Sequence, residues 1–501
     1  MKALYAVSRL HEWTDISKRL KKNYNIEPVY WIHSKLFREE IIDLYPNAVF
    51  HETQFANKAI PAENVILENY LVDKDTIMEF MEIERDFYIM LNRHDMDRSF
   101  SFDDRRDLYY EQLSYWLYVV KKYEITIAVF SETPHTLAHY IIYSICKKLN
   151  IDTIMLSFTT IPGLLYAKNS FEDVPTISVE SNKNRVKGIL EDVIEVMSEG
   201  NHKPWYMLEQ EQKMKRQLSI KKNIKQYYHN IRYLLEIISI KKPLAYKTFY
   251  KKKGKRFQES YYSKSEYSHV LSKNRKKLSL LKDKYKHLSQ DPDLSSKYIY
   301  FPLHYQPERS SCPEGTVYTD QKMVISMLSY VLPEGWKLYV KEHPSQFMLN
   351  RSLLGRTDYY YEDILKNNNV KLIDDSFPSI ELVKKAKAVV TLTGTVGFEA
   401  IIKGVPVLVF GYAWYRDLPG SFYIKNNFDL VKALGKIRDG KISDRNSTID
   451  SLRAMKQYLF LGYLGSGNEK AIDIDYNDHV NELYNGYAAL LDNMGYRRNI
   501  K

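Results

Sequence analysis

The chain has few cysteines, and the two that it has lie far apart. Cys146 and Cys312 are the only cysteines among 501 residues. Two distant cysteines make neither a disulfide framework nor a cysteine cluster for a metal. Their scarcity fits a reducing compartment. Cys146 falls inside an apolar helical pattern, so we expect it in a core.

Long hydrophobic runs are also missing. The first residues, MKALYAVSRLHEW, lack the apolar stretch of a signal peptide. No uninterrupted apolar run reaches the ~18 residues that a transmembrane helix needs. We therefore expect a cytoplasmic protein. Apolar residues still make up 44% of the chain, which is enough for sizeable cores, and the length favours roughly two to four domains.

Acidic residues are scarce in one segment only. Residues 210–290 contain 23 Lys and Arg against 5 Asp and Glu, a local balance of +18, whereas the whole chain carries +11. The rest of the chain therefore carries −7. The basic character belongs to this segment, so it needs a local explanation.

The first part of the chain alternates strand and helix patterns. Short β-rich runs predict strands at 2–7, 28–32, 125–130 and 153–158. A helix is expected over 135–149, because its apolar residues repeat on one face. This alternation predicts a parallel sheet covered by helices.

A second unit of the same kind follows a Lys- and Tyr-rich middle that is nearly free of glycine. Its expected strands are 297–305, 337–343, 371–375, 388–392 and 406–411. We predict an α/β protein with two Rossmann-like, doubly wound domains. The expected parts are an N-terminal domain over 1–178, a basic, mainly helical insert over 179–295, a C-terminal domain over 296–474, and a C-terminal helix over 475–501 that packs back towards the first domain.

Polar residues follow two of the predicted strands of the second unit. In doubly wound sheets, ligands bind beyond the carboxyl ends of the strands. The loop after the first strand contains His304, Gln306, Glu308 and Arg309. The next strand ends at Pro344, which cannot continue a ladder. Lys341 and His343 therefore lie at the sheet edge, where an imidazole is placed to bond a phosphate.

A hydroxyl- and glycine-rich turn follows the strand predicted at 388–392. It contains Thr393, Gly394 and Thr395, and Glu399 lies early in the helix that follows. Glycine allows close approach of a ligand to the backbone, and free amides at a helix start attract phosphate. Glu399 is placed to hold ribose hydroxyls. The pattern is neither a P-loop nor the dinucleotide fingerprint.

The first unit has a matching feature in Glu132 and His135, which follow the strand predicted at 125–130. A carboxylate and an imidazole three residues apart at a helix start are candidates for acid–base catalysis. Each of these groups also has an ordinary structural explanation, such as a helix cap, a solvated turn or a core histidine satisfied by its neighbours.

Three stretches occur in a characteristic order: the loop at 302–309, Glu-His-Pro at 342–344, and Thr-Gly-Thr-x-Gly-Phe-Glu-Ala at 393–400. Together they resemble capsule polysaccharide biosynthesis proteins, including the Kdo transferases of capsule and lipopolysaccharide assembly. The resemblance is clearest over 297–411, weaker over 125–175, and absent over 180–290. It implies the glycosyltransferase-B fold.

The resemblance also implies a nucleotide-sugar site. It assigns His343 to the donor's phosphate, and Thr393, Thr395 and Glu399 to phosphate and ribose. It favours a CMP-activated acidic sugar such as CMP-Kdo. The family's usual Ser-Ser pair is replaced here by Thr393-Gly394-Thr395, which leaves UDP- and GDP-sugars open. The family needs no metal for chemistry, so we expect neither a metal nor a cofactor.

The expected partners are a nucleotide-sugar donor and a polysaccharide or lipid-linked acceptor. Two alternatives stay open. One is a polyol-phosphate transferase of the teichoic-acid type that uses CDP-glycerol or CDP-ribitol. The other is a non-catalytic polysaccharide assembly factor.

The basic segment has three possible interpretations. Nucleic acid is disfavoured as a partner, because no known nucleic-acid motif accompanies the segment. Attraction to the anionic inner membrane leaflet fits better, at about 1 kcal/mol per well-placed Lys or Arg, and interleaved Tyr and Phe suit an interface. A solvated helical face is the plain alternative.

Overall fold

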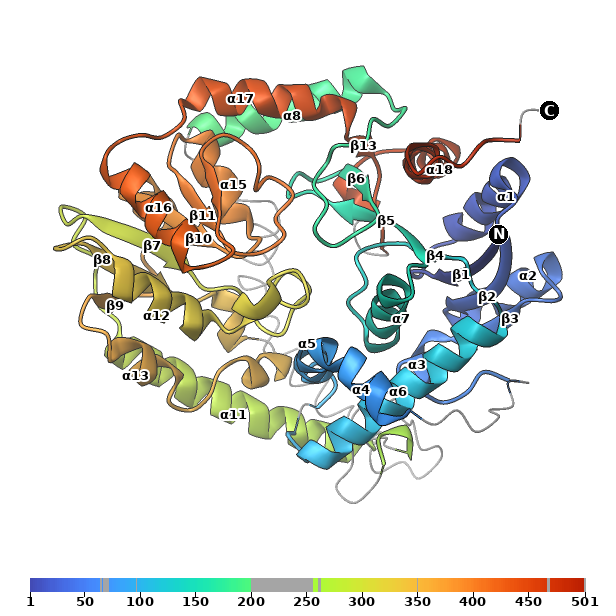
Figure 1. The fold of residues 1–501 in the computed structure, drawn as a ribbon. Helices are drawn as coiled ribbons and strands as arrows, with labels where there is room; N and C mark the ends of the chain where they lie inside the picture. The colour runs from blue at the N-terminus through green and yellow to red at the C-terminus, as the bar shows by residue number, and fades with distance from the viewer. Residues whose placement is uncertain are drawn as a thin grey trace, which may run out of the picture.

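Two α/β units lie side by side in the computed structural model (Figure 1). The structure describes residues 1–63, 65, 72–95, 97–199, 256–259, 263–348, 350–465 and 469–499. Much of the basic segment 210–290 that the sequence singles out, including residues 210–255, lies outside this part of the chain. Among the described residues, no helix combines the length and the apolar character needed to cross a bilayer.

The first sheet has seven strands in the order β13-β6-β5-β4-β1-β2-β3. Strands β5, β4, β1, β2 and β3 are parallel, and β6 is antiparallel to both of its neighbours. The strand bounds are Lys2–Ala6 (β1), Glu27–His33 (β2), Val49–Glu52 (β3), Ile127–Phe130 (β4), Asp152–Phe158 (β5), Leu164–Lys168 (β6) and Phe460–Leu461 (β13).

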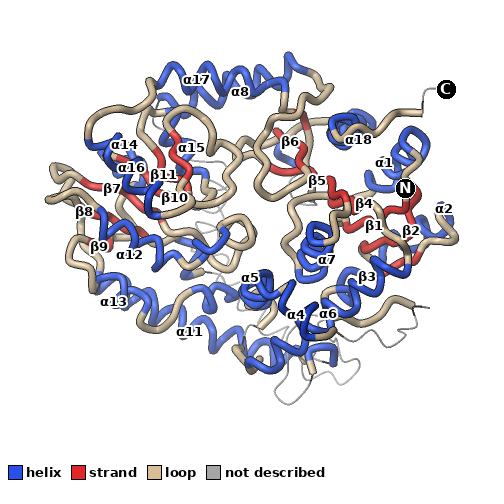
Figure 2. Tube along the Cα trace, viewed as in Figure 1, coloured by secondary structure: helices blue, strands red, loops and turns tan. Residues whose placement is uncertain are grey.

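Helices cover both faces of this sheet (Figure 2). One face packs on α5, α6 and α7, and the other packs on α1 and α18. Helix α6 begins with a capping box, in which Ser101 and Asp104 each bond the other's backbone amide. The helices of this unit are Glu12–Tyr24 (α1), Arg38–Leu44 (α2), Thr53–Ala56 (α3), Lys74–Glu79 (α4), Met81–Leu91 (α5), Phe102–Lys122 (α6), Leu137–Lys148 (α7) and Tyr476–Asn493 (α18).

The second sheet has six parallel strands in the order β12-β11-β10-β7-β8-β9. Its strands are short, and all but the half-buried edge strand β12 are almost wholly buried, as expected for a sheet covered on both faces. Their bounds are Tyr298–Pro302 (β7), Lys337–Lys341 (β8), Val370–Leu372 (β9), Ala388–Thr391 (β10), Val407–Val409 (β11) and Ser421–Tyr423 (β12).

The helices of the second unit form two layers around this sheet. One layer consists of α11, α12, α13 and α16, and the other of α8, α14, α15 and α17. The bounds are Lys183–Glu199 (α8), Lys264–Leu288 (α11), Gln321–Val331 (α12), Tyr360–Leu365 (α13), Ser379–Lys385 (α14), Thr395–Ile402 (α15), Asn427–Arg438 (α16) and Arg445–Ala454 (α17).

The strand orders confirm the predicted fold class. If the parallel strands of each sheet are numbered by their order in the chain, their order across the sheet is 3-2-1-4-5. The second sheet adds a sixth strand after the fifth. This is the Rossmann order, which places a ligand site where the order reverses. In the second sheet the reversal lies between β7 and β10.

The domain boundaries differ from the sequence expectation at both ends of the second unit. Helix α8, expected in the insert, packs against α17 and α15 (Figure 1). Strand β13, placed by the sequence within 296–474, instead pairs with β6 of the first sheet. The chain thus returns to the first unit by Phe460, ahead of the boundary predicted at residue 474. Helix α18 then packs on α1.

Candidate functional site

Three neighbouring strands bring the predicted donor residues to one edge of the second sheet. Strand β7 lies between β10 and β8, and all three run parallel. The loops that follow them carry His304, His343 and Thr393. The predicted phosphate-binding stretches therefore lie side by side at the carboxyl edge, which is the edge that binds ligands in this fold.

His304 supports this edge from inside. Its side chain is buried, and Nε2 accepts a hydrogen bond from the Thr393 amide at 3.3 Å and lies 3.2 Å from Thr391 Oγ1. Burial lowers the pKa of His304 to about 3, so the ring is neutral. The sequence predicts that His304 contacts the donor. In the structure its ring supports the turn at Thr393 by accepting a hydrogen bond from the Thr393 amide, and the donor contact stays a prediction.

His343 is the N-cap of the short 3₁₀ helix Pro344–Phe347 (η4) and is half-buried. Its Nδ1 accepts a hydrogen bond from the Ser345 amide at 3.1 Å. The ring proton of the neutral form must then be on Nε2. Burial lowers the pKa of His343 below its ordinary value, which favours this neutral form. Nε2–H is thus available as a donor to a phosphate oxygen.

The turn after β10 leads straight into α15. Gly394 is the N-cap, and its amide donates to Thr391 Oγ1 at 2.8 Å. The Thr393 hydroxyl donates to Ser310 O at 2.8 Å, so this side chain ties two loops together. The half-buried Thr395 begins the helix. The first amides of α15 thus lie at the sheet edge, where they attract anions.

Glu399 lies further along α15 and is half-buried. Burial raises the pKa of its carboxyl to about 7, and Lys403, one turn later, acts in the opposite direction. Burial raises the pKa of the Tyr300 and Tyr415 hydroxyls, and the charge of Glu399 acts in the same direction.

Three other predicted donor residues serve the architecture of the loops. Lys341 is buried and donates to Phe377 O and Ser379 Oγ, so it fastens the loop before α14; burial lowers its pKa to about 8. The Gln306 side chain donates to Thr319 O. Glu308 is exposed and accepts from the Ser310 hydroxyl at 2.8 Å.

The first sheet contributes Glu132 and His135, directly after β4. Glu132 Oε2 lies 4.0 Å from His135 Nδ1, and Nδ1 donates to Thr133 O at 3.0 Å. Burial lowers the pKa of His135 to about 3, helped by the charges of Arg93 and Arg309. His135 is therefore neutral, and its Nδ1 proton is already engaged.

Glu132 has an environment suited to proton transfer. Burial raises the pKa of its carboxyl to about 7; the Arg309 cation acts to lower that pKa and Glu314 to raise it. A carboxyl with such a pKa is a competent general base near neutral pH. Among the titratable groups at this junction, Glu132 is the best candidate to accept a proton.

Arg309 joins the two units. Its Nη1 lies 3.9 Å from Glu132 Oε2, and its Nε lies 4.0 Å from Glu314 Oε2. The guanidinium stacks over the Phe158 ring at 4.9 Å. Among the described residues, no acceptor lies within hydrogen-bond distance of the buried Nη1. The structure thus brings the predicted residues Glu132 and Arg309 together across the two domains.

Sequence reasoning missed several residues that hold this junction. Arg93 donates to Cys312 O at 2.6 Å and to His135 O, and Trp414 Nε1 donates to Thr160 Oγ1 at 3.2 Å. No signal in the sequence pointed to Arg93, because it lies outside every motif. Thr160 likewise lies outside the motifs that the sequence analysis singled out.

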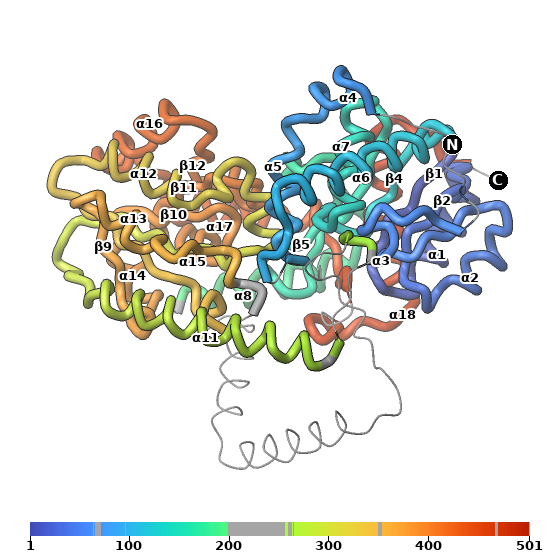
Figure 3. The backbone as a smooth tube through the Cα atoms, turned by 90° about the horizontal axis from the view of Figure 1, so that it is seen from below, coloured from blue at the N-terminus to red at the C-terminus, as the bar shows by residue number. Residues whose placement is uncertain are grey.

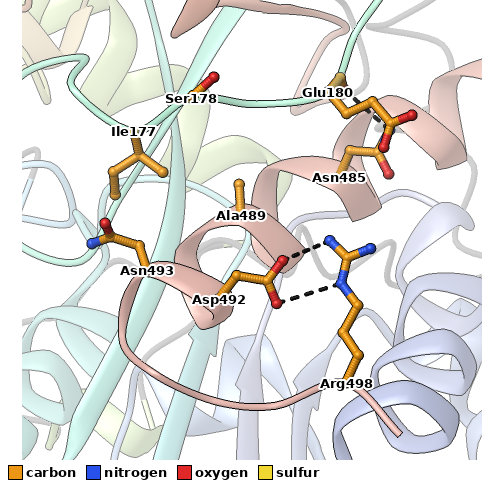
Figure 4. Close-up of a pocket in the computed structure, with 8 residues that line it drawn as sticks. All are labelled: Ile177, Ser178, Glu180, Asn485, Ala489, Asp492, Asn493 and Arg498. Carbon is orange, nitrogen blue, oxygen red and sulfur yellow. Dashed lines mark hydrogen bonds and ion pairs between the residues drawn. The ribbon is translucent and has the colours of Figure 1, made fainter. Parts of the chain in front are cut away.

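A surface hollow on the first unit is lined by residues of α18, by residues that follow α18, and by residues 177–180 (Figure 4). None of the predicted site residues lines it, and its Arg498 and Asp492 neutralise each other at 2.7 Å. Its lining residues are Ile177, Ser178, Glu180, Asn485, Ala489, Asp492, Asn493 and Arg498. Within the described part of the chain, the hollow included, no group of three or more His, Cys, Asp or Glu is arranged to hold a metal ion.

The region that forms this edge matches a known family. Residues 304–421 match the family model described as capsule polysaccharide biosynthesis protein. The capsule polysaccharide modification protein LipA of Neisseria meningitidis serogroup A is 30% identical over 78 residues, which are 16% of this chain and only 10% of LipA. The predicted relation to capsule polysaccharide biosynthesis proteins is confirmed for this region.

Solved structures resemble the chain more distantly. The β-Kdo 2,7 transferase KpsC of Thermosulfurimonas dismutans is 12% identical, with 77% of this chain and 97% of KpsC covered and a TM-score of 0.29. The UDP-GlcNAc 2-epimerase of Methanocaldococcus jannaschii is 13% identical, with 91% and 99% covered and a TM-score of 0.23. The fold assignment therefore depends on the strand orders and not on these likenesses.

Proposed function

We propose that this chain, whose residues 304–421 match the capsule polysaccharide biosynthesis family, transfers a sugar from a nucleotide-activated donor to a surface or capsular polysaccharide. One arrangement carries the proposal. Arg309, in the loop after β7, lies beside the Glu132 carboxylate of the first unit, and His343 and Thr393 follow the neighbouring strands β8 and β10. A candidate base and a candidate phosphate site therefore meet where the two units join. The assignment is a metal-independent transferase of the glycosyltransferase-B type.

The donor would bind at the edge of the second sheet. His343 Nε2–H and the first amides of α15 supply hydrogen bonds to its phosphate, and Glu399 is placed for the ribose hydroxyls. The leaving phosphate would then point towards Arg309. A CMP-activated acidic sugar remains the favoured donor.

The acceptor would approach from the first unit. Glu132 would take the proton of the acceptor hydroxyl, whose oxygen bonds to the anomeric carbon as the bond from that carbon to the donor phosphate breaks. The nucleotide leaves with the electron pair of that bond. If the reaction retains configuration, Glu132 would instead act as the nucleophile.

A thermal-shift panel of CMP, UDP, GDP and CDP conjugates tests this proposal. Stabilisation by CMP or a CMP-sugar supports the favoured donor, and stabilisation by UDP or GDP conjugates supports a transferase with another donor. A response confined to CDP-glycerol or CDP-ribitol supports the teichoic-acid type of transferase. A folded protein that responds to no nucleotide would contradict catalysis and favour an assembly factor.

The basic segment 210–290 suggests an additional partner. We extend the proposal to a peripheral contact with the anionic inner leaflet, where a lipid-linked acceptor would lie. Helix α11 belongs to the described part of this segment, and Figure 3 shows it along one side of the second unit. Its exposed cations include Lys273, Lys276 and Lys277.

A further inference from the structure

The two loops that carry His304 and His343 are tied together by one buried arginine. Arg356 has no exposed side-chain surface. Towards the first loop, its Nη1 donates to Gln306 Oε1 at 2.8 Å and its Nη2 donates to His304 O at 3.0 Å. Towards the second loop, it donates to both carboxylate oxygens of Glu342, at 2.7 and 2.9 Å. Arg356 therefore connects the ends of β7 and β8.

Glu342 extends this connection to the proposed phosphate ligand. Its Oε1 also accepts from the His343 amide at 2.7 Å, and its Oε2 accepts from the Tyr361 hydroxyl at 2.8 Å. The Glu342 side chain has no exposed surface either. A two-pronged guanidinium–carboxylate pair is directional, so it sets both the position and the orientation of the loop.

A second, uncharged link joins the same two loops. The side chain of Gln346 is buried. Its Oε1 accepts a hydrogen bond from the backbone amide of Gln306 at 3.0 Å, and its Nε2 donates to the backbone carbonyl of Gln306 at 3.2 Å. Gln346 belongs to η4, which His343 caps. The first loop is thus held to the second by two independent side chains, Arg356 and Gln346.

The connection also reaches the turn before α15. Arg356 holds the carbonyl of His304, and the ring of His304 accepts from the Thr393 amide. One set of hydrogen bonds therefore runs from the loop after β8, through the loop after β7, to the turn after β10. These are the three places where the donor would be bound.

We propose that Arg356 and Gln346 are positioning residues that preorganise the donor site, by holding the three loops as one rigid cradle before the nucleotide arrives. The inference rests on the proposed function. Groups fixed in advance lose less conformational freedom on binding, so they bind more tightly. A substitution that loosens the cradle should weaken nucleotide binding without removing any group that touches the nucleotide.

The competing explanation is an ion pair that serves stability alone. Tyr361→Phe separates the two explanations, because it deletes one hydrogen bond to Glu342 and leaves every bond to the first loop in place. Arg356→Lys keeps the charge but loses the fork that reaches both loops. Gln346→Met removes the uncharged link at similar volume.

Titration calorimetry with CMP and UDP, alongside thermal unfolding, tests the proposal. We expect Arg356→Lys and Gln346→Met to weaken the Kd of the bound nucleotide on the order of tenfold, with KM raised more than kcat is lowered. Tyr361→Phe should lower the unfolding midpoint and leave Kd within about twofold.

The outcomes separate the positioning role from the proposed function. If the wild type binds a nucleotide and both Arg356→Lys and Gln346→Met bind it as tightly as the wild type does, the positioning role is wrong while the proposed function stands. If the wild-type protein binds no nucleotide, the proposed function fails and takes the positioning role with it. Should Arg356→Lys not fold, Gln346→Met tests the same role without leaving a buried charge unpaired.

Discussion

Arg309 and Glu132 lie in loops that follow strands of different sheets, yet Nη1 of Arg309 lies 3.9 Å from Oε2 of Glu132. The contact places a cation from the proposed donor domain beside the proposed base of the acceptor domain. It also opposes the effect of burial on the carboxyl, so the charge state of Glu132 depends on how the two units meet.

Removing the carboxylate charge at residue 132 should abolish most turnover. For Glu132→Gln we expect kcat to fall on the order of a hundredfold or more, because the acceptor hydroxyl loses its base. Nucleotide affinity should persist, since the donor is bound by the other domain. Steady-state rates and calorimetry measure both. Glu334→Gln, at an exposed carboxylate in the turn between α12 and β8, is the matched control. Near-normal turnover of Glu132→Gln would exclude the Glu132 carboxylate from the mechanism.

The pH dependence should report the same carboxyl. Its pKa is raised from 4.5 to about 7, and a base must be ionised, so kcat/KM should fall as the pH drops below about 7. Arg309 acts to lower this pKa, so Arg309→Met should move the acidic limb to higher pH. Glu399 has a similar pKa, and Glu399→Gln should leave the limb in place. If the acidic limb of the kcat/KM profile does not move in Arg309→Met, the limb reports the ionisation of a group other than Glu132.

The raised pKa also makes a stability prediction. The folded protein holds the Glu132 proton up to about pH 7, whereas the unfolded chain releases it near 4.5. Ionisation therefore favours the unfolded state, and the contribution of this carboxyl to stability declines as the pH rises from about 4.5 to 7. Thermal midpoints of the wild type and of Glu132→Gln should diverge over this window, with the variant less sensitive to pH. Parallel curves would show that the carboxyl titrates normally.

His343 should contribute to affinity through Nε2–H. Asparagine keeps an acceptor for the Ser345 amide but loses the far ring donor, so His343→Asn should weaken nucleotide binding roughly tenfold, the effect of about 1.4 kcal/mol for one hydrogen bond. Calorimetry measures this directly. His269→Asn, at an exposed histidine on α11, should bind as the wild type does. Equal affinities for the two variants would place the phosphate elsewhere.

Gly397 should be required for packing. A Cβ there would lie 2.4 Å from the Tyr415 hydroxyl oxygen and 2.7 Å from Thr391 Cγ2. Gly397→Ala should therefore destabilise the protein by about 1–3 kcal/mol. The control is Gly435→Ala in α16, where a Cβ meets no atom within 4 Å, and a gain of about 0.5–1 kcal/mol is expected. Thermal unfolding compares them, and equal midpoints would contradict the close packing at Gly397.

The location of the strands was largely predictable, because short β-rich runs bounded by polar turns give a clear signal. The strands expected near 28–32 and 388–392 appear as β2 and β10. Strand β13 was not predictable: its two residues carry no periodicity, and only the distant β6 makes them a strand.

The candidate site was predictable as a set of strand ends but not in the roles of its members. The motif at 342–344 pointed to His343, and that assignment stays a prediction. The same motif gave no hint that Glu342 faces inward to Arg356, whose segment contains no motif. Burial and long-range partners decide such roles, and neither is written in local sequence.

The return of the chain at β13 affects how the protein can be made and cut. The first unit gets an edge strand and the helix α18 from residues that are synthesised after the whole second sheet. The first unit therefore cannot complete its core until residues 460–493 have left the ribosome. A fragment that stops after α8 would leave the apolar surface on α1 uncovered, so separating the halves requires grafting residues 456–499 back onto the first.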